Sequence, residues 1–217
     1  MKFLRWVMTV AVLAAPAVTQ KNDWLIVPGQ RVGPITATTT RAELDSLFGK
    51  QNVQERNLEG SGGPEAATVV YPGDQSAALA ITWDRERPAA IRICAGNQTG
   101  PCKWRTASGI RIGLPTRELD KLNGKSFQVS GFNQDDGKVV SWRHGALEED
   151  PAACGHLVVG LAPAAMVDGR SMSKGESALW KDLQGDKPYS SGYLPLLELN
   201  TTVSALTLEF TGSGCGK

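Results

Sequence analysis

The chain has 217 residues, with 23 basic and 22 acidic side chains and a formal net charge of +1. A nearly neutral chain without a cluster of Lys and Arg lacks the electrostatic footprint of proteins that bind nucleic acid or anionic membrane surfaces. Its length allows one large domain or two modules of about 80 to 100 residues.

Residues 1–17 have the pattern of a signal peptide. Lys2 and Arg5 form a positive start, residues 6–18 are apolar, and Ala15-Pro16-Ala17 fits the small-x-small rule for cleavage. The apolar stretch is shorter than the roughly 20 residues of a membrane-spanning helix, and an uncleaved N-terminal anchor is the alternative. We therefore expect an exported protein, periplasmic or extracellular, with no membrane anchor after signal cleavage.

One ten-residue phrase occurs twice, 75 positions apart. The two copies are RAELDSLFGK (41–50) and TRELDKLNGK (116–125), and they agree at six positions. A threonine at the expected N-cap (Thr39 or Thr40 in the first copy, Thr116 in the second) and a terminating glycine (Gly49, Gly124) predict a short amphipathic helix in each. Helices of about two turns are not stable alone, so each must pack on a sheet.

Runs with strand-like composition follow each helix. They are residues 53–58, 67–73, 76–83 and 89–94 after the first, and 126–132, 138–145, 156–162 and 204–210 after the second. In the run 138–145, strict alternation would place Val140 and Trp142 on one face and Val139, Ser141 and Arg143 on the other.

This order of elements predicts an α+β fold made of two repeated modules. Each module is expected to be a short helix packed on a four-stranded, mostly antiparallel sheet, at residues 18–103 and 104–217. The segment NQDDG (133–137) is interpreted as a hairpin turn, because it lacks the late glutamate of a calcium loop.

The second module carries an insertion at about residues 163–202. Within it, residues 176–185 predict one helix that ends at Gly185. Trp180, Tyr189 and Tyr193 lie in this insertion, and two interpretations remain open for them. They are either exposed anchors of a protein interface or members of a small packed cluster of their own.

Four cysteines, Cys94, Cys102, Cys154 and Cys215, indicate two disulfides in an oxidising compartment. Three pairings are possible, and we favour Cys94 with Cys102 and Cys154 with Cys215. The cysteines lack the paired spacing of zinc sites. We expect no metal and no cofactor.

Catalysis would have to use His144 or His156, the two histidines of the chain. Ser141 and His144 have odd spacing and would face opposite sides of a strand, and no GxSxG motif occurs. Cys154 lies two residues from His156, but a structural disulfide is favoured over a thiol catalyst for this cysteine. A hydrolase-type enzyme using either histidine is the alternative to a binding function.

The repeated phrase, with Ile35 and Ile110 at equivalent positions ahead of it, resembles the BLIP-like and SmpA/OmlA-like modules of bacterial envelope and secreted proteins. The stretch Leu122 to Leu147 also looks like part of a set of uncharacterised secreted bacterial proteins. The resemblance implies a module that binds or assembles proteins without catalysing a reaction.

The expected partner is therefore another envelope or secreted protein. Our candidates for its binding are Trp180, Tyr189, Tyr193, Trp142 and Arg143. A small-ligand carrier with its pocket between the two sheets is a further alternative.

Overall fold

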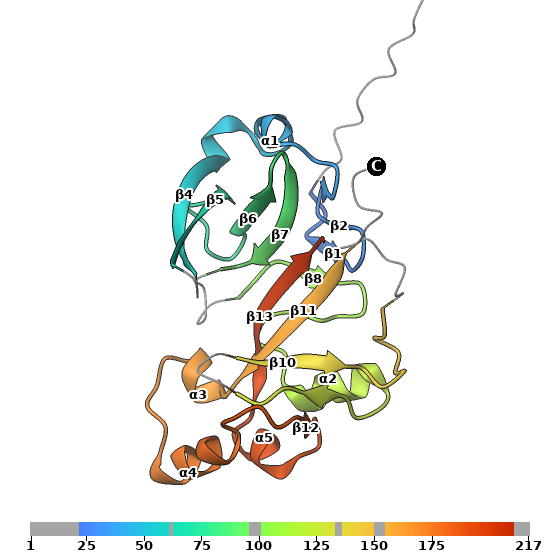
Figure 1. The fold of residues 1–217 in the computed structure, drawn as a ribbon, viewed down its shortest axis with the longest axis vertical. Helices are drawn as coiled ribbons and strands as arrows, with labels where there is room; N and C mark the ends of the chain where they lie inside the picture. The colour runs from blue at the N-terminus through green and yellow to red at the C-terminus, as the bar shows by residue number, and fades with distance from the viewer. Residues whose placement is uncertain (1–21, 61–62, 96–100, 133–135, 150–154, 211–217) are drawn as a thin grey trace, which may run out of the picture.

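The computed structural model describes residues 22–60, 63–95, 101–132, 136–149 and 155–210. The predicted signal peptide, Cys154 and Cys215 lie outside these residues. The described chain is an α+β fold, as predicted, and is built mostly of strands (Figure 1). None of its helices is long and apolar enough to cross a membrane.

The strands are β1 (Leu25–Val27), β2 (Arg31–Val32), β3 (Ile35–Thr36), β4 (Val53–Gly60), β5 (Gly63–Val70), β6 (Leu79–Asp84), β7 (Arg87–Ile93), β8 (Arg105–Thr106), β9 (Gln128–Val129), β10 (Gly137–Ser141), β11 (His156–Ala162), β12 (Tyr189–Ser190) and β13 (Thr202–Glu209). The helices are α1 (Arg41–Phe48), α2 (Thr116–Asn123), α3 (Ala164–Val167), α4 (Lys174–Asp182) and α5 (Leu194–Glu198), with a 3₁₀ turn at Lys50–Asn52.

Most of the described strands belong to one nine-stranded sheet, in the order β12-β9-β10-β11-β13-β7-β6-β5-β4. The strands expected in two separate sheets therefore share one. The junction is the antiparallel pair β13–β7, where Leu206 lies opposite Ile93 and Leu208 opposite Ile91. Figure 1 shows β11 and β13 running between the region of β4–β7 and the region of α2 to α5. The buried leucines and isoleucines at this junction make one continuous core.

A second sheet of four short strands, in the order β3-β2-β1-β8, was not predicted. Its parallel pair β1–β8 places Leu25 opposite Arg105, so the segment that joins the two halves of the sequence is bound to the N-terminal strands. Trp104 stands just before β8, is fully buried, and donates its indole N–H to the carbonyl of Ala77 at 2.9 Å. Trp104 is therefore a core residue.

Both repeated helices form where the sequence predicts them. In α1 the N-cap is Thr40, whose backbone N–H donates to the Glu43 carboxylate at 2.7 Å, and Leu44 and Phe48 are buried. This hydrogen bond is the largest of the effects that lower the pKa of Glu43 below its usual value. The chain leaves α1 through Gly49 at a φ of +84°, a conformation that favours glycine.

The second helix differs from its prediction in small ways. The N-cap of α2 is Pro115 and Thr116 is the first helical residue, where its buried hydroxyl bonds to that of Thr201 at 2.7 Å. Leu119 is fully buried, whereas Leu122 is 36% exposed. Gly124 ends α2 in the left-handed conformation, as predicted.

The strict alternation expected around β10 fails. Val140 is 56% exposed while Trp142 is buried, so the two do not share a face. The register between β10 and β9 shifts between Val139 and Ser141, and β10 ends at Ser141. A bulge adds a residue to one strand and reverses the faces beyond it, which explains why Trp142 turns into the core.

The insertion at 163–202 contains more structure than the single helix expected. The predicted helix is α4, capped by Ser173, whose hydroxyl accepts the N–H of Glu176. It ends before Leu183, ahead of the predicted stop at Gly185. The segment also supplies α3 and α5, and its strand β12 pairs with β9 at the end of the large sheet.

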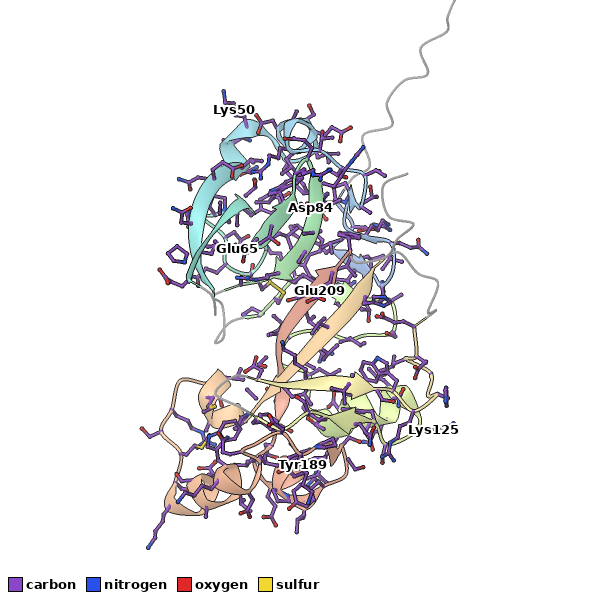
Figure 2. The ribbon with its side chains drawn as sticks, in the orientation of Figure 1. Lys50, Glu65, Asp84, Lys125, Tyr189 and Glu209 are labelled. Carbon is purple, nitrogen blue, oxygen red and sulfur yellow. A yellow bond between two sulfur atoms is a disulfide. The ribbon has the colours of Figure 1, made fainter. Side chains whose placement is uncertain are left out.

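A disulfide joins Cys94 to Cys102, which confirms that predicted pair (Figure 2, yellow bond). We expect the double variant Cys94→Ser/Cys102→Ser to lose about 2.5 kcal/mol of unfolding free energy, because the short closed loop restricts the unfolded chain. Urea unfolding of the two proteins under oxidising conditions measures the loss without exposing other cysteines to reductant. An unchanged midpoint would contradict the prediction.

Candidate binding cleft

A cleft of about 390 Å³ lies where four segments meet. These are the turn between β1 and β2, the residues that follow β8, the segment after β10, and the start of β11. The lining residues are Pro28, Gly29, Gln30, Ser108, Ile110, Trp142, Ala146, Leu147, Glu148, Glu149 and Leu157. Its walls are largely apolar, and its charged groups are two adjacent carboxylates.

The wall formed by residues 142–149, hereafter the cleft loop, has an unusual backbone. Arg143 and His144 have φ values of +54° and +56°, so two consecutive residues with side chains are left-handed. This conformation costs roughly 1 kcal/mol or more at each residue and persists only where the surroundings enforce it. Residues with such backbone angles cluster at functional sites, so the cleft loop is a candidate site.

Asn123, the buried last residue of α2, enforces the shape of the cleft loop. Its side-chain N–H groups donate to the carbonyls of Lys125 and Trp142 at 2.7 and 2.9 Å. Its side-chain oxygen accepts the N–H of Leu147 at 3.2 Å, and its backbone carbonyl accepts the N–H of Ala146. One buried side chain therefore ties together both ends of the strained segment.

Two further features hold the cleft loop against α2. Gly145 lies so close to the Asn123 side chain that any added Cβ would collide with it. Lys125, labelled in Figure 2, donates from Nζ to the carbonyl of His144 at 3.1 Å. Because these contacts surround the loop on its inner side, the side chains of Arg143 and His144 are left exposed.

Glu149 is the most buried charged group of the cleft, with 18% of its side chain exposed. Its two oxygens accept the N–H of Leu157 at 3.0 and 3.2 Å, and Nδ1 of His156 lies 3.5 Å from Oε2. Burial raises the pKa of Glu149 above its usual value, outweighing the lowering effects of the Leu157 amide and of His156. Glu148 is exposed and accepts the N–H of His144 at 3.0 Å.

Two of the five predicted partner-binding residues belong to this region. Trp142 forms part of the cleft wall, but it is buried, so it shapes the cleft more than it offers free surface. Arg143 is exposed on the adjoining loop.

The other three lie apart, in the region of α4 and α5. Trp180 packs its ring on Phe132, and Tyr189 is buried and donates its hydroxyl to the carbonyl of Asp182 at 2.7 Å. Tyr193 stacks on Tyr189 and is 39% exposed. Of the two interpretations, the packed cluster describes Trp180 and Tyr189, and Tyr193 alone of the three offers a large exposed ring.

Neither histidine lines the cleft: His144 belongs to the cleft loop, and His156 is the first residue of β11, next to the lining residue Leu157. Within the described residues, no serine, threonine or cysteine side chain is hydrogen-bonded to either imidazole. The Ser141 hydroxyl instead accepts the N–H of Arg143 at 3.1 Å. No group of three or more His, Cys, Asp and Glu side chains that could hold a metal occurs in the part of the chain described.

Sequence reasoning missed Asn123 and Glu149. A usable signal for Asn123 was present, because the two copies of the repeated phrase differ there: the first has the buried Phe48 where the second has Asn123. An amide in place of an aromatic core residue indicates a buried hydrogen-bonding role. Glu149 had no such signal, since its burial depends on contacts with distant segments.

Comparisons with protein-family models, with curated proteins and with solved structures gave no match to this chain.

Proposed function

We propose that this protein is an exported, non-catalytic binding protein that recognises another envelope or secreted protein through the cleft and the cleft loop. The observation that carries this proposal is the pairing of a 390 Å³ cleft with a wall held in a strained conformation by Asn123. A rigid, preformed surface binds without a large entropic cost of ordering, which is what recognition requires. The disulfide and the absence of a membrane-spanning helix among the described residues agree with export.

We further propose that the two halves are repeats of one module, as the resemblance to BLIP-like and SmpA/OmlA-like proteins implies. The order of elements supports this idea. A short helix precedes the strands of the large sheet in each half: α1 precedes four of them (β4–β7) and α2 precedes five (β9–β13), the additional one being β12 of the insertion. The last strands of the two halves, β7 and β13, pair with each other. Neither the cleft nor the insertion is repeated in both halves.

The cleft favours one alternative, a carrier of a small ligand. Its volume lies near the lower end of the range of about 300–1,000 Å³ for small-molecule sites, and its lining combines apolar side chains with a few polar ones. A carrier would hold its ligand in the absence of any partner protein.

Filling the cleft is expected to abolish partner binding. Ala146 lines the cleft and is exposed, so Ala146→Trp adds a large ring at the entrance without disturbing the core. We expect partner recovery from periplasmic or culture extracts to fall at least about tenfold, corresponding to about 1.4 kcal/mol. Quantitative mass spectrometry of proteins captured by the tagged variant and wild type measures the change.

Val140→Trp is the matched control, because it adds the same ring at an exposed position that does not line the cleft. It should capture the same proteins as wild type. Equal capture by the Ala146→Trp variant, with an unchanged urea midpoint, would refute the proposed site. A small molecule released from wild type on denaturation, with no captured protein, would favour the carrier.

A further inference from the structure

We propose that the cleft recognises a lysine side chain of the partner protein, with the ammonium group at Glu148 and Glu149 and the aliphatic stem along the apolar wall. This inference deepens the proposed function and rests on it. It follows from the charge of the cleft, the chemistry of its walls, and the hydrogen bonds that Glu149 already makes.

The charged side chains that line the cleft are all acidic. None of the described residues that line it is Lys, Arg or His, whereas Glu148 and Glu149 both line it. Among the described residues, neither carboxylate forms an ion pair with a lysine or arginine, and Nδ1 of His156 lies 3.5 Å from Oε2 of Glu149. A half-buried carboxylate that lacks a lysine or arginine partner has already lost much of its hydration. A cation from a binding partner therefore interacts with it more strongly than with a carboxylate at the open surface.

The apolar walls suit a long side chain with a charged end. Ile110, Trp142 and Leu157 line the cleft together with the two glutamates. Lysine buries its methylene stem against apolar surface while its ammonium group stays at a polar site. An acidic guest would be repelled by the two carboxylates. A purely apolar guest would leave them without a cation.

The hydrogen bonds of Glu149 favour lysine over arginine. Both oxygens of Glu149 accept the Leu157 N–H, at 3.0 and 3.2 Å, and Glu148 accepts the N–H of His144. The planar fork of arginine binds best where both oxygens of one carboxylate are free to accept in parallel. An ammonium group needs one lone pair from each of several acceptors, which two adjacent, partly occupied carboxylates can offer.

Binding should weaken in acid. Ammonium recognition requires ionised Glu149, whose pKa is raised by burial, so affinity falls as the pH drops through this raised value. His156 faces the same carboxylate, with its Nδ1 3.5 Å from Oε2 of Glu149. Glu148 and the exposed Arg143 and His144 are the other charged or titratable groups of the cleft loop, and Lys125 contacts its backbone.

The test is titration of the full exported chain with the peptide acetyl-Gly-Gly-Lys-Gly-Gly-amide, followed by ¹⁵N–¹H NMR. Peptides with norleucine or arginine in place of lysine are the comparison probes. We expect shifts at the amides of Glu149 and Leu157 and at the Trp142 indole. The lysine peptide should bind at least about tenfold more tightly than the norleucine peptide, and more tightly than the arginine peptide.

Glu149→Gln should reduce lysine-peptide affinity about tenfold and weaken its pH dependence, while glutamine still offers an oxygen to the Leu157 N–H. Glu148→Gln is the second test variant, and Glu59→Gln, on the distant strand β4, is the control. Equal affinity for lysine and norleucine peptides, or no shifts in the cleft at saturating peptide, would overturn the inference. The proposed function would survive that result if Ala146→Trp still abolished partner capture.

Discussion

Replacement of Asn123 by alanine is expected to lower the free energy of unfolding by about 3 kcal/mol and to release the cleft loop. The substitution removes two donors and one acceptor: the carbonyl of Lys125 and the N–H of Leu147 lose their partner, and the Trp142 carbonyl keeps only the N–H of Gly145 at 3.1 Å. Buried polar groups without partners cost roughly 1–3 kcal/mol each, and water entering the site will offset part of that cost. Urea unfolding gives the loss of stability.

The structural consequence can be measured separately. Without the Asn123 side chain, Arg143 and His144 lose part of the hydrogen bonding that holds their positive φ values, so their amide resonances should move toward those of ordinary loop residues. Asn57→Ala is the control, because Asn57 lies exposed on β4 and its loss should change stability by less than about 0.5 kcal/mol. A loss below about 1 kcal/mol with unchanged loop resonances would show that Asn123 does not organise the cleft.

Trp104→Ala is expected to cost about 4 kcal/mol, the largest single effect among our predictions. The ring is fully buried, packs edge-to-face on Trp24 with centroids 5.0 Å apart, and lies against Gly33 in the turn between β2 and β3. It therefore fills the space between the small sheet and the segment just before β6, where Ala77 lies. Thermal and urea unfolding, monitored by circular dichroism, measure the loss.

Trp104→Phe separates packing from hydrogen bonding. Phenylalanine keeps much of the ring but not the indole N–H that bonds to the Ala77 carbonyl, so we expect a loss of about 1–2 kcal/mol. A cost for Trp104→Ala no larger than that of Trp104→Phe would mean that the ring contributes little through packing.

Much of the local structure could be predicted because its causes are local. The helices at 41–48 and 116–123 follow from an N-terminal capping position, leucines on one face and a terminating glycine, all within about ten residues. The strands after each helix follow from composition and turn residues. The pairing of Cys94 with Cys102 follows from a short separation and a turn-like sequence between them.

Other features depend on contacts between distant segments. The strands of the small sheet have two or three residues each, too few for any periodicity to be visible, and β1 pairs with β8 across some 80 residues of intervening chain. The bulge in β10 changes which face Trp142 occupies, and nothing in the alternation of the sequence reports it. The partial burial of Glu149 likewise depends on β11 and the β1–β2 turn.

The repeated phrase separates what amino-acid order determines from what only the folded chain decides. Its helix-forming pattern, the disulfide of the first half and the α+β class follow from amino-acid order alone, because capping, amphipathic spacing and short-range cross-linking act between near neighbours. The joining of both halves in one sheet through β7 and β13, and the cleft beside Asn123, follow only from the folded chain. Strand pairing and burial are long-range outcomes, set by which surfaces exclude water together, and several pairings satisfy the same local preferences.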